Sequence, residues 1–114
     1  ERLALQQAFS KKHKVIIVLK GANTSISDTN GNIYFNSSGN AGMATGGSGD
    51  VLTGIITGLL AQQYSSIDAA IVGVYLHGLA ADIALKNQSM ESLIASDIID
   101  SLGNAFNEIR NHTA

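Results

Sequence analysis

The residues best suited to chemistry lie in a glycine-dense segment, where five of the chain's twelve glycines fall between Gly39 and Gly49. Glycines let backbone N–H groups turn inward without a Cβ clash, and such donors at the start of a helix bind anions. Asp50 follows at once, and its carboxylate would repel phosphate unless it serves as a base for a hydroxyl. The segment therefore predicts phosphoryl chemistry, with Asp50 as base and an anion hole of backbone amides. The anion-hole candidates are Gly46, Gly47, Ser48 and Gly49.

An ordinary loop followed by a first-turn acid is the alternative interpretation, and for an isolated glycine-rich loop it would be the better one. Here the glycine density and the long apolar helix expected behind the loop favour a site. Other phosphate and nucleophile motifs are incomplete. There is no P-loop, the run Gly47-x-Gly49-x-x-Leu52 lacks the third glycine of a dinucleotide fingerprint, and Gly46-x-Ser48-x-Asp50 lacks the last glycine of a nucleophile elbow.

A second candidate site follows an uninterrupted apolar run at residues 15–19. Such a short, β-branched run is typical of a strand buried on both faces, as in a parallel sheet. Ligands of open α/β sheets bind at the carboxyl ends of strands, so Lys20 could meet a phosphate and Thr24 could add hydrogen bonds. A lysine that merely ends a strand beside a turn is an equally good explanation of these residues alone.

No metal-ligating residue is assigned from the sequence. The chain has no cysteine, and its three histidines show no metal-ligand spacing. The pattern Asp28-x-Asn30-x-Asn32 resembles the start of a calcium loop but lacks the required glycine and glutamate, so a hairpin turn is the better interpretation. His77 is expected to be a core histidine with a local hydrogen bond.

The elements that must position these residues form an α/β pattern. Apolar side chains at Leu5, Ala8 and Phe9 indicate a short helix at residues 2–12, and the strand 15–19 leads into a hairpin of residues 25–27 and 33–35. Three helices follow, which begin near Asp50, after a capping box at Ser65, and at Ser96-Asp97. The middle helix is apolar nearly all round and should be buried on two sides. Gly54 and Gly58 in the first of them are expected to permit close backbone contacts.

Length and composition limit the number of domains and the kinds of partner that we expect for this chain. The chain has 114 residues, 45% hydrophobic and 14% charged, with a formal net charge of −2. We therefore expect one packed domain, and no partner among nucleic acids or membranes. The longest apolar region, residues 69–85, contains His77 and Asp82 and is expected to be short of a membrane span. The first residue, Glu1, reads as the middle of a helix, which suggests a piece of a longer protein.

Three segments, residues 18–24, 42–54 and 73–78, resemble the ADP/ATP-dependent NAD(P)H-hydrate dehydratases of the ribokinase-like superfamily. The most specific is the block that runs from Gly42 through Met43-Ala44-Thr45-Gly46-Gly47-Ser48-Gly49-Asp50 to Gly54. The resemblance implies a ribokinase-like three-layer αβα fold, of which residues 1–114 would be the C-terminal half of a single nucleotide-binding domain. That half would hold the buried strand, the hairpin and the three helices.

The resemblance also implies an activity. ADP or ATP, with Mg²⁺, would phosphorylate the ring hydroxyl of hydrated NADH or NADPH, and loss of phosphate would restore the nicotinamide. Asp50 matches the acid at the hydrated nicotinamide. The residues that match the nucleotide-binding positions of the family are Lys20, Gly21, Ala22, Asn23, Thr24 and Gly49.

The chain departs from the family in length, because the family domain is more than twice as long, and in Ser38, where threonine is common. We expect the whole protein to be a cytoplasmic lyase and homo-oligomer, and the 114-residue chain alone to be inactive. Two alternatives stay open. One is a ribokinase-like kinase of the hydroxymethylpyrimidine type, which the Met43–Gly47 lead-in disfavours, and the other is a nucleotide-binding module without catalysis.

Overall fold

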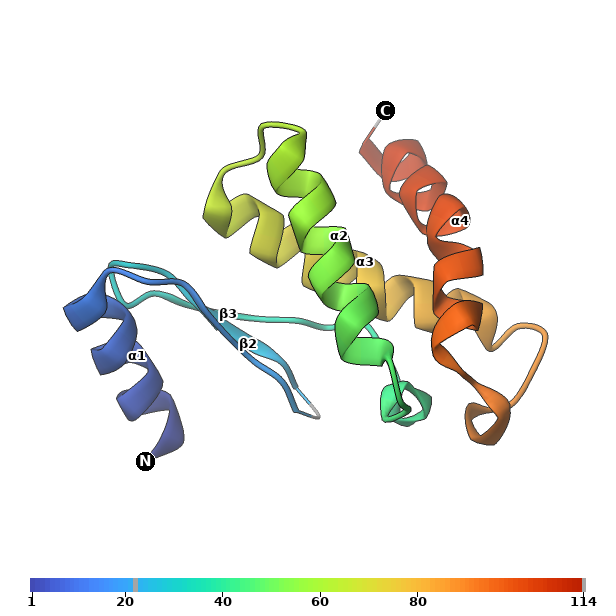
Figure 1. Cartoon of the computed structure of the whole chain (residues 1–114), viewed down its shortest axis with the longest axis horizontal. Coiled ribbons are helices and arrows are strands. Elements are labelled where there is room, and N and C mark those ends of the chain that lie inside the picture. The colour runs from blue at the N-terminus through green and yellow to red at the C-terminus, as the bar shows by residue number, and fades with distance from the viewer. Residues whose placement is uncertain (22, 114) are drawn as a thin grey trace.

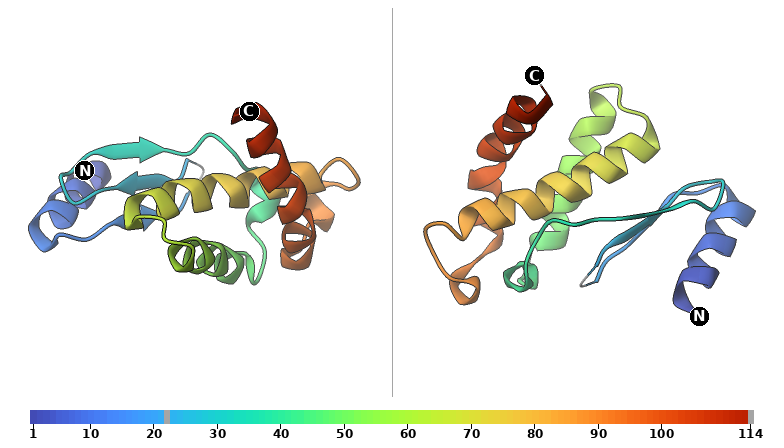
Figure 2. Two further views of the ribbon diagram at one scale, coloured as in Figure 1. Left: turned by 90° about the horizontal axis from the view of Figure 1, so that it is seen from above. Right: turned by 180° about the vertical axis from the view of Figure 1, so that it is seen from behind.

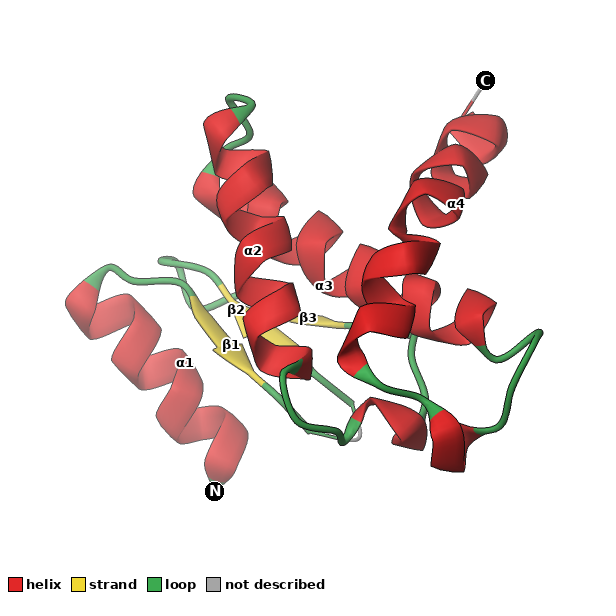
Figure 3. Ribbon diagram, turned by 45° about the vertical axis from the view of Figure 1, so that its right-hand side comes forward, coloured by secondary structure: helices red, strands yellow, loops and turns green. Residues whose placement is uncertain are grey.

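A small antiparallel sheet lies between one N-terminal helix and a layer of three longer helices (Figures 1 and 3). The computed structural model describes residues 1–21 and 23–113. Its N-terminal part comprises α1 (Arg2–His13), β1 (Ile17–Leu19), β2 (Ser25–Ser27) and β3 (Ile33–Phe35). Its C-terminal part comprises the short η1 (Ala41–Met43), α2 (Ser48–Ala61), α3 (Ser66–Ala84), the short η2 (Met90–Ser92) and α4 (Ala95–Thr113).

The hairpin of β2 and β3 has the bounds that the sequence predicts. The strands pair with Ser25 opposite Phe35 and Ser27 opposite Ile33. Between them, Asp28 Oδ1 accepts the backbone N–H groups of Asn30 and Asn32, each at 2.9 Å. The Asp28 carboxylate therefore stabilises the turn between β2 and β3 instead of beginning a calcium loop, which confirms the hairpin interpretation.

β1 differs from the sequence prediction in its pairing and its burial. It pairs antiparallel with β2, Ile17 opposite Ser27 and Leu19 opposite Ser25, whereas the apolar run predicts a parallel sheet. All three of its residues are half-buried rather than buried on both faces. The reason is that β1 is an edge strand within the described part of the chain, since the strand order is β1-β2-β3.

The two faces of β2 join different helices, which gives the three layers. Ile26 is 2% exposed and packs with Leu52 of α2 and Val74 of α3. On the opposite face, Ser25 Oγ donates to Gln6 Oε1 of α1 at 2.9 Å, and Ser27 hydrogen-bonds to both Gln6 and Ser10. The three-layer arrangement expected from the sequence is therefore present around this strand.

The predicted N-terminal helix is present, but its buried face is polar. Gln6 and Ser10 are its buried residues, while Leu5 is 70% and Phe9 54% exposed. The serines of β2 require hydrogen-bonding partners once they are covered, so α1 turns its polar residues toward the sheet. Its apolar side chains consequently face outward.

α3 is the central helix of the C-terminal layer and packs against both α2 and α4 (Figure 2). Its cap is the predicted one, because Ser65 Oγ accepts the Asp68 N–H at 3.2 Å. Burial on two sides is confirmed by the main apolar cluster, which includes Leu59, Leu76, Ala80, Leu93, Ile98 and Ala105. Contrary to the sequence expectation, α3 is long and apolar enough to cross a membrane, with a mean hydropathy of 1.5. Its burial is that of a core helix.

Two glycines of α3 allow close packing that any Cβ would prevent. A Cβ on Gly78 would lie 2.7 Å from the carbonyl carbon of Ser38 and 2.8 Å from the Gly39 nitrogen. A Cβ on Gly73 would lie 2.7 Å from Ile56 Cγ1 of α2. The prediction for Gly54 and Gly58 of α2 was wrong, because a Cβ at either position meets nothing within 4 Å.

Candidate functional site

The first turn of α2 presents backbone donors without a side-chain cap. Its N-cap residue is Gly47, with φ of 88°, and no side chain accepts from the turn. The Ser48 N–H donates to the Thr45 carbonyl at 3.3 Å. Within residues 1–21 and 23–113, no acceptor lies in hydrogen-bonding range of the Gly49 or Asp50 amide. Free amides at the positive end of a helix dipole are a binding site for an anion.

Lys20 adds a positive charge to the same turn. A Cβ built on Gly49 would lie 3.3 Å from Lys20 Nζ, so the ammonium group stands directly over the start of α2. The side chain is exposed and reaches the turn from the end of β1. The two segments singled out from the sequence therefore meet at one place, and both contribute positive charge there.

A pocket of about 560 Å³ opens between these two segments and α3. It is lined by residues from the loop between β1 and β2, the 36–44 loop, α2 and α3, among them Lys20, Gly21, Thr24, Ser48, Leu52 and His77. Cavities of this size accommodate small-molecule ligands, and each of these segments except the apolar part of α2 adds a polar side chain to the lining, for example Lys20, Asn40, Ser48 and His77.

The loop that forms one wall of this pocket is tied to α3. The carboxylate of Asp82 accepts the Gly39 N–H at 2.9 Å and the side-chain amide of Asn40 at 2.8 Å. Ser38 Oγ donates to the Tyr75 carbonyl at 2.9 Å, next to the place where the loop backbone packs against Gly78. The loop therefore lies against α3 through two hydrogen-bonded points and one close backbone contact.

His77 connects α3 to the start of α2. Its side chain is 2% exposed, and its Nε2 lies 3.1 Å from Ser48 Oγ. Burial, and next the charge of Lys20, hold the pKa of His77 below its ordinary value, although a hydrogen bond with Ser48 opposes them. The expectation of a core histidine is confirmed, but its hydrogen bond is not local, because the partner Ser48 lies on α2, 29 positions away in sequence.

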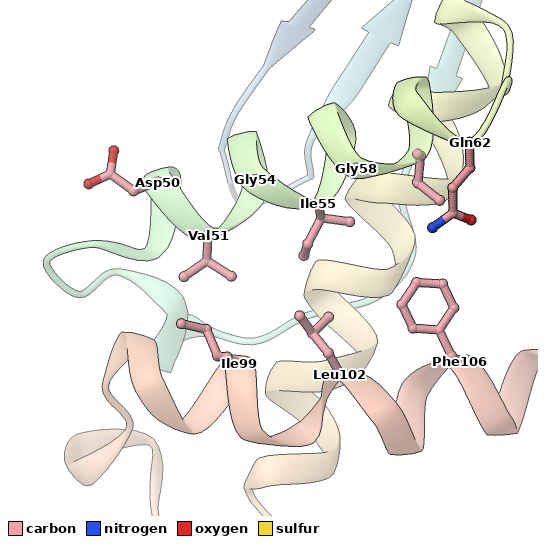
Figure 4. Close-up of a pocket in the computed structure, with 10 residues that line it drawn as sticks. Asp50, Val51, Gly54, Ile55, Gly58, Gln62, Ile99, Leu102 and Phe106 are labelled. Carbon is pink, nitrogen blue, oxygen red and sulfur yellow. The ribbon is translucent and has the colours of Figure 1, made fainter.

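Asp50 lies on the other side of the α2 terminus. It is exposed, in the first turn of the helix, and at the rim of a separate groove of about 520 Å³ between α2 and α4. The groove is apolar, with Val51 and Ile55 facing Ile99 and Phe106, and the Asp50 carboxylate points away from them (Figure 4). Asp50 thus stands next to the free amide of Gly49 and is open to a ligand.

The structure gathers most of the predicted site residues but not all. Lys20, Gly21, Thr24 and Ser48 line one pocket, and Gly49 lies under Lys20. Asn23 is exposed, and Gly46 and Gly47 are exposed in the loop. Ala22 lies outside the described residues.

Sequence reasoning missed the pocket-lining roles of Asn36, Asn40 and His77. The signal for His77 was its place in the 73–78 segment of the resemblance.

The described residues hold no group of three or more His, Cys, Asp or Glu side chains that could bind a metal ion. A divalent cation at this site would therefore depend on a bound nucleotide or on other residues for most of its ligands.

The model of one protein family, described as NAD(P)H-hydrate dehydratase, matches residues 1–104. The chain belongs to the NAD(P)H-hydrate dehydratase family. Among curated relatives, it is 43% identical over 102 residues to the bifunctional NAD(P)H-hydrate repair enzyme Nnr of Moorella thermoacetica, covering 90% of this chain and 19% of that protein. It is 48% identical over 83 residues to the ADP-dependent (S)-NAD(P)H-hydrate dehydratase of Neisseria meningitidis, covering 72% and 28%.

Solved structures of the family superpose closely on this chain. The ADP/ATP-dependent NAD(P)H-hydrate dehydratase of Bacillus subtilis, co-crystallized with ATP/Mg²⁺, matches with a TM-score of 0.88 and 32% identity over 95% of this chain and 39% of that one. A ribokinase-like superfamily protein of Enterococcus faecalis matches with a TM-score of 0.77 and 38% identity, over 93% and 36%. The fold is therefore the ribokinase-like one. The chain spans about a fifth of the length of the Nnr relative, 19%, and less than half of the solved dehydratase.

Proposed function

We propose that the protein containing this chain dehydrates hydrated NADH or NADPH at the expense of ADP or ATP. The observation that carries the proposal is the first turn of α2, where free amides lie under Lys20 and beside Asp50. The names of the relatives, NAD(P)H-hydrate dehydratase and repair enzyme, support the substrate. Residues 1–114 would form the C-terminal part of one nucleotide-binding domain.

In this proposal each group of the chain has one task. Lys20 and the amides of Gly46, Gly47 and Gly49 hold the nucleotide phosphates, while Gly21, Ala22, Asn23 and Thr24 complete the nucleotide site. The Ser48 amide contributes less than the sequence suggested, because it already donates to Thr45. Fixed donors stabilise the negative charge that develops on the transferred phosphoryl group.

Asp50 would act as the general base. It accepts the proton of the ring hydroxyl as that oxygen attacks the terminal phosphoryl group, and the nucleotide leaves with one phosphate fewer. The ring nitrogen then expels phosphate from the carbon beside it, and loss of a proton from the next ring carbon to water restores the double bond of the dihydronicotinamide. Mg²⁺ would supply charge neutralisation on the phosphates, and it would depend on the nucleotide or on other residues for most of its ligands, because the described residues offer no cluster of three His, Cys, Asp or Glu side chains.

We further propose a cytoplasmic, homo-oligomeric protein that binds neither nucleic acid nor membranes. The formal net charge of −2 supports the first absence, since nucleic-acid binding relies on basic surfaces. Burial of α3 between α2 and α4 supports the second.

The proposal is tested by supplying the whole protein with ADP or ATP, Mg²⁺ and hydrated NADH. We expect the absorbance of reduced nicotinamide to return and free phosphate to appear in equal amount. A flat absorbance, together with stable phosphorylation of hydroxymethylpyrimidine by ATP, would identify a kinase instead.

Asp50→Asn tests the catalytic role within that assay. The variant should bind nucleotide like the unmodified protein and lose about 10²–10⁴-fold in turnover, the usual effect of removing a general base. Calorimetry and phosphate release measure the two quantities separately. Turnover near the normal rate would refute the role of Asp50.

A further inference from the structure

The proposed chemistry leaves His77 without a task, although its buried imidazole touches the start of α2. We propose that His77 is a positioning residue that anchors the first turn of α2 to α3 through the Ser48 hydroxyl, and so fixes the amides that bind the nucleotide phosphates. The inference rests on the proposed function in taking a nucleotide as the ligand. The anchor itself rests on the contact between α2 and α3.

Besides His77, the first turn of α2 contacts the start of α4, because a Cβ on the N-cap Gly47 would lie 3.2 Å from Ala95 Cβ. Ser48 is its buried residue, 3% exposed, whereas Asp50 is exposed and the N-cap Gly47 supplies no side-chain bond. A Cβ at Gly46, just before the turn, would meet nothing within 4 Å. The Ser48–His77 contact is therefore a buried polar contact that joins this turn to α3.

α3 is a suitable support because ten of its 19 residues are buried. The same helix also holds the 36–44 loop, which forms another wall of the pocket. Asp82 accepts hydrogen bonds from that loop, and the loop backbone packs directly against Gly78. α3 therefore fixes the position of the 36–44 loop and the position of the α2 amides relative to each other. Donors that stabilise a phosphoryl group act only when they are held in place before the ligand arrives.

Burial, and next the charge of Lys20, which approaches from the end of β1, lower the pKa of the His77 imidazole. Asp50 lies in the turn of α2 that His77 anchors, and Asp82 on α3 is engaged by Gly39 and Asn40. The lowered pKa of His77 favours the uncharged imidazole, which forms the hydrogen bond with Ser48.

The test is a double-mutant cycle on the whole protein, with ADP and ATP affinities measured by calorimetry. His77→Phe keeps the ring volume and Ser48→Ala keeps the helix, and each should weaken binding about tenfold, which is roughly 1.4 kcal/mol. The double variant should be no weaker than either single one. His77→Gln, whose amide reaches about as far as Nε2, should restore most of the affinity.

Thr57→Val is the matched control, because Thr57 is exposed on the same helix and its hydroxyl donates to the Thr53 carbonyl one turn earlier. Unchanged affinity in His77→Phe or Ser48→Ala, multiplied losses in the double variant, or no recovery in His77→Gln would each overturn the inference.

A readout without nucleotide separates this inference from the proposed function. The Val51 N–H donates to the Gly47 carbonyl at 3.1 Å and closes the first turn. Its hydrogen exchange should be about tenfold faster in both single variants. If the unmodified protein bound neither ADP nor ATP, the proposed function would fail, but accelerated exchange would still support the anchor, and unchanged exchange would refute it.

Discussion

Gly49 shows how one missing side chain shapes the site. Its φ is not in the left-handed region, which among the glycines is occupied by Gly31, Gly39 and Gly47. The constraint at Gly49 is instead the 3.3 Å between a built Cβ and Lys20 Nζ. The absence of a side chain therefore leaves the space between an ammonium group and a helix terminus open for a ligand.

We accordingly expect Gly49→Val to weaken ADP or ATP binding by about tenfold or more, since a branched side chain would displace Lys20 and cover the free amides. Thr57→Val introduces the same side chain two turns later, far from Lys20, and should leave the affinity unchanged. Calorimetry on both variants measures the difference. Equal affinities would show that phosphate binds elsewhere.

His77 also predicts how stability depends on pH. Its pKa is lowered in the folded state from the ordinary 6.5, so the unfolded chain takes up a proton more readily. The folded state is therefore most stable above about pH 6.5 and loses stability as the pH falls toward the lowered pKa of His77. Thermal melts between pH 5 and 8 should show a smaller loss in His77→Gln than in the unmodified protein. Parallel curves would contradict this assignment.

At the scale of elements, local patterns predicted what local interactions decide. The turn residues Asp28 and Gly31 specify the hairpin, and Ser65 caps α3, all within a few residues of the chain. Burial of Gln6 against Ser25 could not be predicted in this way, because polar residues become a buried face only when a sheet supplies partners.

The candidate site was predictable to a similar degree. The glycines and the acid before a helix predict an anion hole and a base because such residues have local meaning, and both roles stay predictions. The contribution of His77 is tertiary, because it depends on α3 crossing α2 at Ser48, 29 positions away in sequence. Ile99 of α4 is 52% exposed and lines the groove between α2 and α4, which likewise depends on tertiary packing.

The glycines of α2 provide a test at the same scale. A Cβ at Gly58 meets nothing, so Gly58→Ala should raise the free energy of unfolding by up to about 1 kcal/mol through helix propensity. Gly73→Ala is the matched change in α3, where Ile56 stands in the way, and it should lower stability. Denaturant unfolding of the whole protein measures both. Destabilisation by Gly58→Ala would show that another surface packs into the α2–α4 groove.

At the scale of the whole molecule, apolar side chains face solvent at the sheet end. Leu5 and Phe9 of α1 and Phe35 of β3 are each more than half exposed, and β1 is an edge within the described residues. Open sheet edges and apolar patches favour association. We expect the 114-residue chain, expressed alone, to self-associate in sedimentation experiments. A monodisperse monomer that unfolds cooperatively would contradict this expectation.

The two closely packed glycines of α3, Gly73 and Gly78, restrict substitution among relatives in different ways. At Gly78 the obstacle is the backbone of Ser38 and Gly39, which every amino acid carries, so no second substitution can make room for a side chain. At Gly73 the obstacle is the side chain of Ile56, which a smaller residue would remove. Among relatives, position 78 should therefore stay glycine whatever occupies position 38. Position 73 should be free to become alanine in those lineages where position 56 has become smaller.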